Sequence, residues 1–356
     1  MRLGLVIYGA LETRSGGCLY DKKLVEYLRR HGDEVEIVSI PASNYPCHLS
    51  GNFSPSLHRR IADLDVDILL QDELIHPSLA FINRASKGKI NYPLVSIVHH
   101  LRSSEKHCRP LLCLYRWVET SYLRTIDAFI FNSRTTRGEV ERLVGKAIPS
   151  VVATPAGDRF GSVLDEARIV ARAKQAGPLR LLFIGNVIRR KGLHTLLAAL
   201  ARLRDEDWVL HIAGRQEINK AYTRQLKRFV SQSLSDRVIF MGETSDADLV
   251  ALLETSHVLA APSSYEGFGI VYLEAMAYGV VPIASSAGGG AEIVQDSKNG
   301  FLIEPGDFIA LEDRLRRLCR NRNILLSLAL PARRCFAEFP GWEQTCAKIH
   351  SFLYSL

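Results

Sequence analysis

Two glutamates, Glu266 and Glu274, stand eight positions apart in the segment PSSYEGFGIVYLEAMAYG, residues 262–279. Gly267 and Gly269 lie between them, and good helix-forming residues follow. Glycines at a strand-to-helix turn let backbone N–H groups approach a ligand closely, and the first turn of a helix attracts anions. Because helical side chains tilt toward the N-terminus, Glu274 can point back at the same ligand. Carboxylates accept hydrogen bonds from hydroxyl groups, so the pattern predicts a site for a phosphorylated sugar.

Each glutamate also has a simpler interpretation, in which Glu266 caps the turn and Glu274 is a solvated helix residue. That interpretation is sufficient for either residue alone, but the combination of glycines, helix start and two carboxylates favours a binding site. Lys191 is a further candidate, because it stands at a predicted helix start, where a cation is slightly unfavourable without another task. The two arginines before it, Arg189 and Arg190, are otherwise ordinary surface residues.

Candidate ligand-binding residues of the N-terminal half lie where predicted strands end: Gly16, Gly17, Asp72, Glu73, His76, His99 and His100. In open parallel sheets ligands bind beyond the carboxyl ends of the strands, which favours a functional role for these positions. Each of these residues also has a structural explanation. Glycine pairs often only make turns, a histidine at a strand end is more often structural, and the Asp72–Glu73 pair can cap the next helix.

Short apolar runs alternate with helical periodicity along the chain, which indicates parallel sheets covered by helices on both faces. In the first half we predict strands at 3–8, 34–40, 68–70, 94–99 and 128–131, and helices at 19–31, 56–64, 111–123 and 135–143. After a Gly- and Pro-containing break at 150–178, we predict strands at 179–184, 208–213, 238–241, 258–261 and 281–284, and helices at 193–203, 221–234, 246–255 and 270–277.

The length of 356 residues suits two domains of this kind. We predict an α/β protein in which two Rossmann-like domains face a central cleft. The first domain occupies 1–160, a linker region 161–178 and the second domain 179–335. An amphipathic helix in the last segment, 336–356, is expected to return toward the first domain.

Composition excludes several classes of protein. Apolar content of 47% and charged content of 23% are ordinary for a globular enzyme, and no apolar run is long enough for a transmembrane helix. The odd number of cysteines, without a CxxC pair, favours reduced thiols over disulfides or a zinc site. The start of the chain lacks the features of a signal peptide, so we expect a cytoplasmic protein.

The net charge of +7 falls mostly in the N-terminal half, and this can reflect solubility or attraction to phosphates or an anionic membrane. The segment 109–124 combines leucines, Trp117 and arginines, and it can be a membrane-surface helix. An amphipathic core helix is the commoner explanation and the one we favour. We therefore allow peripheral contact with the inner membrane face, and we expect no nucleic-acid partner.

Two short sequence patterns resemble binding motifs, but we do not interpret them as sites. The DxD sequence of Asp65 and Asp67 precedes a predicted strand and is interpreted as surface charge rather than a metal site. No GxGxxG follows the first strand, so a dinucleotide cofactor is poorly supported. We expect no cofactor and no obligatory metal.

The segment EGFGIVYLE resembles the E-x7-E signature of the retaining glycosyltransferases of the GT-B fold, and it is most similar to their family 4. Three further segments resemble the same family: FIGNVIRRKGLHTLL at 183–197, the run from VIFMGETS to the signature, and the glycine-rich 284–307. The resemblance covers about 179–307 well. In the first half it is carried more weakly by Gly16-Gly17, SIVHHL (96–101) and DAFIFNS (127–133).

The resemblance implies a role for each matching residue. Glu274 would hold the ribose hydroxyls of a nucleotide-sugar donor, and Glu266 would contact the transferred sugar. Lys191 would bind the diphosphate, and His99 would orient the sugar or the acceptor. Phosphate would be bound by the backbone around Gly267, Phe268, Gly269 and Ile270, and Gly16 and Gly17 would face it. His100, Asp72 and Glu73 are acceptor-side candidates.

One position departs from the family pattern, because Asn186 stands where the family usually has an arginine that binds the diphosphate. One explanation is that Arg190 or Arg189 supplies that cation, and of the two we slightly prefer Arg190. The other explanation is that donor binding is weakened. The resemblance implies a retaining hexosyl transfer from a UDP- or GDP-sugar to a saccharide or glycolipid, as in polysaccharide or glycolipid biosynthesis, and we expect it to be metal-independent. The alternatives are a nucleotide-sugar epimerase or hydrolase of the same fold, and a non-catalytic nucleotide-sugar-binding subunit.

Overall fold

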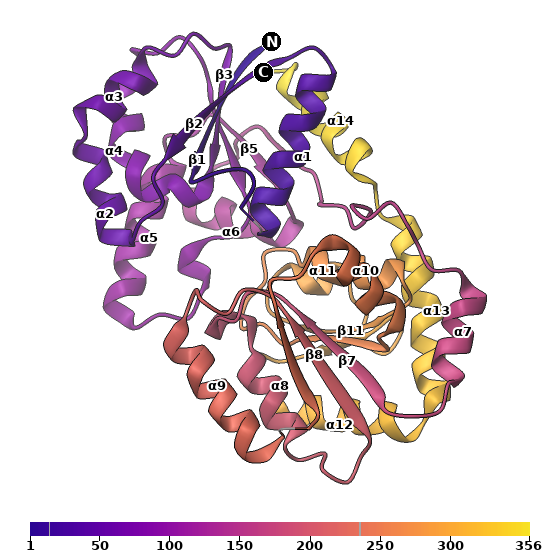
Figure 1. The fold of residues 1–356 in the computed structure, drawn as a ribbon. Helices are drawn as coiled ribbons and strands as arrows, with labels where there is room; N and C mark the ends of the chain where they lie inside the picture. The colour runs from indigo at the N-terminus through magenta and orange to yellow at the C-terminus, as the bar shows by residue number, and fades with distance from the viewer. Residues whose placement is uncertain (14, 235) are drawn as a thin grey trace. The chain divides into compact units, whose positions relative to one another are not determined.

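The computed structural model describes residues 1–13, 15–234 and 236–356, and the chain forms two compact units (Figure 1). Unit 1 consists of Met1–Pro155 together with Pro340–Leu356, and unit 2 of Ala156–Phe339. Each unit contains one six-stranded parallel sheet with helices against it. The predicted fold class, two Rossmann-like α/β domains, is confirmed.

The sheet of unit 1 has the strand order β2-β1-β3-β4-β5-β6. Central strands such as β4 are buried along their whole length, because helices cover both faces of the sheet, and this explains their continuous apolar sequences. The strands are β1 (Arg2–Tyr8), β2 (Glu34–Ile40), β3 (Ile68–Asp72), β4 (Leu94–Val98), β5 (Ala128–Phe131) and β6 (Ser150–Val152).

The helices of unit 1 lie on both sides of this sheet. Figure 1 shows α2, α3, α4 and α5 together on one side, and α1 with the C-terminal helix α14 on the other. Their bounds are α1 (Gly16–Arg30), α2 (Tyr45–Ser50), α3 (Pro55–Ala62), α4 (His76–Ser86), α5 (Arg109–Leu123), α6 (Arg134–Val144) and α14 (Trp342–Leu353), with short 3-10 turns η1 (Gly51–Phe53), η2 (Glu73–Ile75) and η3 (Arg102–Ser104).

The C-terminal helix α14 packs against α1, and this confirms the predicted return of the chain end to the first domain. Asp33, which is buried after α1, accepts hydrogen bonds from Tyr354 at 3.0 Å and lies 2.9 Å from His350 Nε2. Thr345 Oγ1 donates to the Thr154 carbonyl at 2.7 Å, and Trp342 contacts the Tyr20 ring edge-on. The helix is therefore an integral part of unit 1.

The sheet of unit 2 has the strand order β12-β11-β10-β7-β8-β9. Its strands are β7 (Leu179–Ile184), β8 (Trp208–Ala213), β9 (Val238–Gly242), β10 (Val258–Ala261), β11 (Val281–Ser285) and β12 (Phe301–Ile303). The helices are α7 (Glu166–Lys174), α8 (Leu193–Leu200), α9 (Lys220–Ser233), α10 (Asp246–Thr255), α11 (Ile270–Ala277), α12 (Phe308–Arg320) and α13 (Arg322–Glu338), with 3-10 turns η4 (Arg189–Lys191) and η5 (Gly289–Glu292).

Helix α7 lies within the range expected as a linker, yet it belongs to unit 2, where it packs against α13. Its Arg172 side chain is buried and donates to four carbonyls, at 2.7–3.1 Å, on Leu253, Glu254, Tyr278 and Gly279. Burial lowers the pKa of Arg172 to about 10. Two of these carbonyls are at the carboxyl end of α10, where a helix has unpaired carbonyls and attracts cations.

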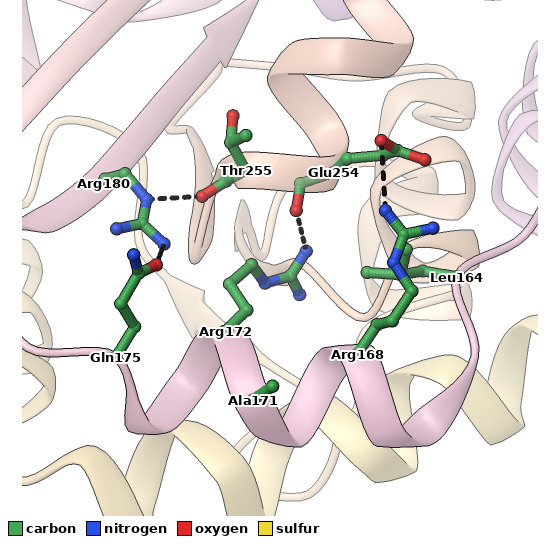
Figure 2. Close-up of a pocket in the computed structure, with 8 residues that line it drawn as sticks. All are labelled: Leu164, Arg168, Ala171, Arg172, Gln175, Arg180, Glu254 and Thr255. Carbon is green, nitrogen blue, oxygen red and sulfur yellow. Dashed lines mark hydrogen bonds and ion pairs between the residues drawn. The ribbon is translucent and has the colours of Figure 1, made fainter.

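An open cavity of about 450 Å³ lies beside α7 (Figure 2). Arg180 donates to the Thr255 carbonyl at 2.6 Å and to Gln175 at 3.1 Å, while Arg168 lies 3.4 Å from the Glu254 carboxylate. The arginines around the cavity are thus mainly engaged in ending α10 and joining α7 to it. We assign this cavity a structural role.

Among the residues that the structure describes, none of the helices combines the length and the hydropathy needed to cross a bilayer.

Candidate functional site

The E-x7-E segment of unit 2 forms the backbone cradle that its sequence predicts. The turn after β10 ends at Gly269, the N-cap of α11, whose φ of +100° favours glycine. The glycine-rich loop after β11 lies directly against this turn. Gly289 N–H donates to the Glu266 carbonyl at 2.8 Å, and a Cβ on Gly288 would lie 2.0 Å from the same carbonyl oxygen. Only glycine fits at position 288. Because glycine stands there, the glycine-rich loop can pack directly against the turn before α11, and the two loops form one surface.

A second close approach of backbones places Lys191 beside Glu266. Gly192 has a φ of +72°, and a Cβ there would lie 1.9 Å from the Pro262 carbonyl oxygen. Ser264 N–H donates to the Arg190 carbonyl at 2.7 Å, which fixes the η4 turn against the segment before Glu266. Lys191 Nζ then lies 2.7 Å from Glu266 Oε2. The two predicted residues, 75 positions apart, therefore form an ion pair.

The charges around Glu266 keep its carboxyl group ionised. Burial alone would raise the pKa of Glu266, but the positive charges of Lys191 and Arg190 and hydrogen bonds from Lys191 and Ser263 lower it to about 2. Ser263 Oγ donates to Oε2 at 3.1 Å. An ionised carboxylate beside a cation can accept hydrogen bonds from sugar hydroxyls while the cation binds phosphate.

The two arginines that could replace the missing family arginine are placed differently. Arg190 Nη1 donates to the Tyr265 carbonyl at 3.1 Å, next to Glu266. Arg189 instead lies over the Tyr222 ring, 5.2 Å from its centroid. Asn186 follows the end of β7. The preference for Arg190 over Arg189 stays a prediction, and this placement supports it.

Glu274 is buried just past the middle of α11, with a side chain 2% exposed. Burial raises the pKa of Glu274, and the charge of Arg159 opposes that rise. Arg159 Nε lies 2.6 Å from Glu274 Oε1, and its guanidinium also lies over the Phe160 ring. The carboxylate predicted to hold a ribose is therefore paired with Arg159, and a ribose bound there would share it with Arg159 or displace Arg159.

Arg159 and Ser263 were not among the sequence-predicted residues. Ser263 lies three positions before Glu266, and its position inside the motif was the signal available. Arg159 precedes α7 in a stretch without periodicity or motif. Its partner Glu274 lies 115 positions away, so only the fold brings the two together.

The candidates of unit 1 centre on His99, which directly follows β4. Its Nε2 lies 3.0 Å from Asp21 Oδ1, and its ring packs against Gly17, where a Cβ would lie 3.0 Å from His99 Cδ2. Gly16 and Gly17 are the first residues of α1 rather than part of the preceding loop. The position of Asp21 on α1, one turn after Gly17, therefore sets the orientation of the imidazole. Sequence analysis did not identify Asp21.

Buried carboxylates make His99 a cation at neutral pH. Burial alone would lower the pKa of His99, but Asp21, Asp72 and Glu73 raise it to about 9. Burial and the charge of Asp21 raise the pKa of Asp72 to about 7. A cationic imidazole held by Asp21 can donate a hydrogen bond to an oxygen of a sugar or a phosphate.

The raised pKa of His99 makes the stability of unit 1 depend on pH. Protonation of His99 stabilises the fold fully below the unfolded-state pKa of about 6.5, and this contribution is lost as the pH rises through about 9. We expect the free-energy advantage of the wild type over His99→Gln to shrink by about 3 kcal/mol across that window. Urea unfolding at a series of pH values measures it.

His58→Gln, a change on α3 of the same unit, is the matched control and should show no such trend. A His99→Gln variant whose deficit is the same at both ends of the pH window would contradict the ion pair with Asp21.

The other acceptor-side candidates are less accessible. Asp72 Oδ1 accepts a hydrogen bond from Leu74 N–H at 3.0 Å, so this residue caps η2 as well as facing His99. Glu73 is fully buried, and burial raises its pKa. His100 Nε2 lies 3.1 Å from Glu105 Oε1. The roles of these three residues in binding an acceptor stay predictions.

Acidic and histidine side chains also meet in two buried groups of unit 1, Asp21–Asp72–His99 and Glu73–His76–Glu119. In the first group the imidazole is protonated near neutral pH, and a protonated imidazole is a poor metal ligand. Asp65 and Asp67, the declined DxD pair, are exposed and pair with Arg2. The expectation that the protein needs no metal stays a prediction.

Comparison with known protein families gives two matches that together span most of the chain. Residues 165–333 match the model described as glycosyl transferases group 1, and residues 20–155 match the model described as glycosyltransferase family 4. The first match contains the whole cradle of unit 2, and the second contains Asp21 and His99.

Curated relatives carry related names. The chain is 28% identical over 279 residues to a glycogen synthase of Mycobacterium tuberculosis, covering 75% of this chain and 63% of that protein. It thus spans less than two thirds of that relative's length. It is 28% identical over 348 residues to a phosphatidyl-myo-inositol mannosyltransferase of Mycobacterium leprae, covering 90% of this chain and 88% of that protein.

Solved structures show the same fold at low identity. A sucrose-phosphate synthase from Thermosynechococcus elongatus superposes with a TM-score of 0.84 and 21% identity over 99% of this chain and 98% of the other. The Anabaena protein HepE, in complex with UDP-glucose, superposes with a TM-score of 0.79 and 19% identity over the full length of both chains.

Proposed function

We infer an activity for this chain from the family to which it belongs, because it is a member of the family 4, group 1 glycosyltransferases and has their GT-B fold. We propose that it transfers a hexose from a UDP- or GDP-sugar to a hydroxyl of a saccharide or glycolipid. The observation that carries the proposal is the cradle of unit 2, where a lysine, an ionised carboxylate and a glycine-rich backbone surface meet.

The proposal assigns separate tasks to the cradle residues. Lys191 stabilises the diphosphate leaving group, whose negative charge grows as the glycosidic bond breaks, so the cation acts more strongly on the transition state than on the ground state. Glu266 accepts hydrogen bonds from the transferred sugar. The first turn of α11 binds phosphate, and Glu274 binds the ribose hydroxyls after Arg159 shifts.

We further propose retention of the anomeric configuration by a front-side route. The donor's anomeric C–O bond breaks, the acceptor oxygen attacks from the same face, and the acceptor's proton passes to the departing diphosphate oxygen. In unit 1, the His99 imidazolium would donate a hydrogen bond to the sugar or acceptor. Isolation of a covalent glycosyl-enzyme would overturn this route.

A lipid-borne acceptor has support from a relative, because the mannosyltransferase of Mycobacterium leprae is named for a phosphatidylinositol. The choice of UDP has support from the HepE structure, whose title names UDP-glucose. Neither name fixes the donor or the acceptor of this chain. The predicted cleft, too, stays a prediction about the arrangement of the units.

Thermal-shift screening of UDP, GDP, ADP and their sugars without metal tests the donor site. A ligand that binds only the folded state raises Tm by mass action, and we expect a clear shift with one nucleotide. Glu274→Ala should abolish most of it, and Lys191→Ala should reduce it. Glu338→Ala and Lys220→Ala, at exposed positions of the same unit, are matched controls and should retain it.

Each other outcome argues against the proposal in a defined way. No shift with any nucleotide would mean that Asn186 marks a lost donor site. Donor consumption without an acceptor would favour an epimerase or hydrolase. Binding without turnover, across a panel of saccharide and lipid acceptors, would favour a non-catalytic subunit.

A further inference from the structure

Helix α5 of unit 1 exposes large apolar side chains beside its core contacts. Its buried face includes Tyr115 and Tyr122. Leu111, Leu114 and Trp117, spaced three apart and therefore on one side of the helix, are 43%, 38% and 57% exposed. A helix that only covered a core would have polar residues there. The interpretation of 109–124 as a core helix thus accounts for half of its surface.

The exposed apolar residues continue beyond α5. The ring of Trp117 lies 6.0 Å from that of Phe81 on α4, and Phe81 lies 6.1 Å from Phe53 in η1. Phe53 is 76% exposed, the highest exposure among the large apolar side chains that the structure describes as exposed. We call Phe53, Phe81, Leu111, Leu114 and Trp117 the α5 surface. Large contiguous apolar patches on a protein mark binding sites rather than ordinary solvent-facing surface.

Positive charge predominates on the helices that carry the α5 surface. Figure 1 shows α2, α3, α4 and α5 on one side of the first sheet. The sequences of these helices and of η1 contain a single acidic residue, Glu119, which is buried and accepts hydrogen bonds from Arg102 and Ser103. The same elements carry five exposed arginines: Arg59, Arg60, Arg84, Arg109 and Arg116.

We propose that the α5 surface adsorbs to an anionic lipid bilayer. Tryptophan and phenylalanine insert at the boundary between headgroups and acyl chains, while arginines bind the anionic headgroups. A second copy of the chain is a poorer occupant, because a two-fold interface through this surface would bring like charges together. The charge pattern therefore selects a membrane rather than a dimer.

Membrane adsorption goes beyond the proposed function. The adsorption itself does not depend on that function, whereas the choice of acceptor inferred from it does. The adsorbing surface lies in unit 1 and involves none of the cradle residues of unit 2. If the chain is the proposed glycosyltransferase, then adsorption selects an acceptor hydroxyl carried by a membrane lipid over one on a free saccharide.

The protein offers a direct optical readout of adsorption. It has three tryptophans, of which Trp208 and Trp342 are buried, so Trp117 is the exposed one. Titration of the full chain with vesicles of equimolar phosphatidylglycerol and phosphatidylcholine should shift its tryptophan emission to the blue. Lipids brominated along the acyl chain should quench that emission. Pure phosphatidylcholine vesicles should give much weaker binding.

Two pairs of substitutions separate the apolar and the charged contributions. Phe53→Ser with Leu114→Ser, which keeps Trp117, should weaken vesicle affinity by about tenfold or more. Arg109→Gln with Arg116→Gln should weaken it by about fivefold for each arginine. Ile218→Ser with Ile309→Ser, at exposed positions of unit 2, is the apolar control, and Arg224→Gln with Arg228→Gln is the charge control.

Three results would overturn the proposal. The first is equal binding to neutral and anionic vesicles, and the second is an equal loss of affinity in the control pairs. The third is a protein that does not bind vesicles and instead sediments as a dimer, which the Leu114→Ser change dissociates. Nucleotide thermal shifts on the same variants keep the two proposals apart. Vesicle binding without a nucleotide shift would contradict only the proposed function, and a nucleotide shift without vesicle binding would contradict only the α5 surface.

Discussion

Replacement of Lys191 by methionine should lower kcat/KM for sugar transfer by about 10²- to 10³-fold, with a smaller effect on the affinity for the donor. Methionine keeps the length and packing of the side chain but removes the charge. The ammonium group lies 2.7 Å from Glu266, and this ion pair fixes its position. A fixed cation requires little reorganisation during the reaction, and its loss therefore falls mainly on the transition state.

The same substitution removes a counter-charge from a buried carboxylate, so the loss of activity must be separated from a loss of folding. Without Lys191 the pKa of Glu266 should rise from about 2, because burial is then less opposed. The double variant Lys191→Met with Glu266→Gln removes the lone charge, and it should recover stability without recovering transfer.

Steady-state kinetics with the nucleotide sugar found by thermal shift, together with urea unfolding, tests this prediction. Lys220→Met at the exposed start of α9 is the matched control, and it should behave like the wild type. A Lys191→Met enzyme whose kcat/KM stays within a few-fold of the wild type would show that the diphosphate is bound elsewhere.

Gly288→Ala should abolish nucleotide binding while leaving both units folded. The new Cβ would lie 2.0 Å from the Glu266 carbonyl oxygen, and neither atom can move without separating the glycine-rich loop from the turn before α11. The backbone at Gly288 also has a φ of +91°, which strains any other residue. A displacement near 1 Å in a binding constellation can cost about 10²-fold, so we expect at least that loss in nucleotide affinity.

Gly306 offers a matched control, because its φ is +85° and no neighbouring atom lies near the position of an added Cβ. Gly306→Ala should therefore show the conformational strain alone, about 1–2 kcal/mol in the free energy of unfolding. Calorimetric titration with the nucleotide and urea unfolding measure both variants. Equal nucleotide affinity in the two would mean that the contact between the two loops is not part of the donor site.

The turn before α11, one part of the cradle of unit 2, could be predicted from sequence because its geometry is local. Glycines with special backbone angles, a helix start and a carboxylate follow one another within a dozen residues around Glu266 and Gly269. Nothing in the sequence itself indicated that Lys191 pairs with Glu266, and only the family resemblance assigned both residues to one donor. The structure supplies the physical cause in Gly192, which allows two backbones to approach.

Residues that act through distant partners could not be predicted. Asp21 lies on α1 at a position that helical periodicity alone does not distinguish, and its importance comes from His99, 78 positions away. Arg159 depends in the same way on Glu274. A buried charge is recognisable in sequence only when its partner is a near neighbour.

Some secondary structure was also missed for physical reasons. Helix α4 was not predicted, because its sequence HPSLAFINRAS is buried around most of its circumference, which weakens the amphipathic signal. The strands β6 and β12 have three residues each and lie at sheet edges, too short for a periodic pattern. The longer central strands were found because continuous apolar runs are typical of parallel sheets.

The position of α14 has a consequence for the order in which the chain can fold. During synthesis, Met1–Pro155 emerges first, but its α1 face lacks the helix that carries Trp342 and His350 until all of unit 2 has been made. Unit 2, whose residues are contiguous, can complete its own contacts before then. The first unit to be synthesised is therefore the last to be finished, and meanwhile Tyr20 and Asp33 lack the partners that bury them in the mature fold.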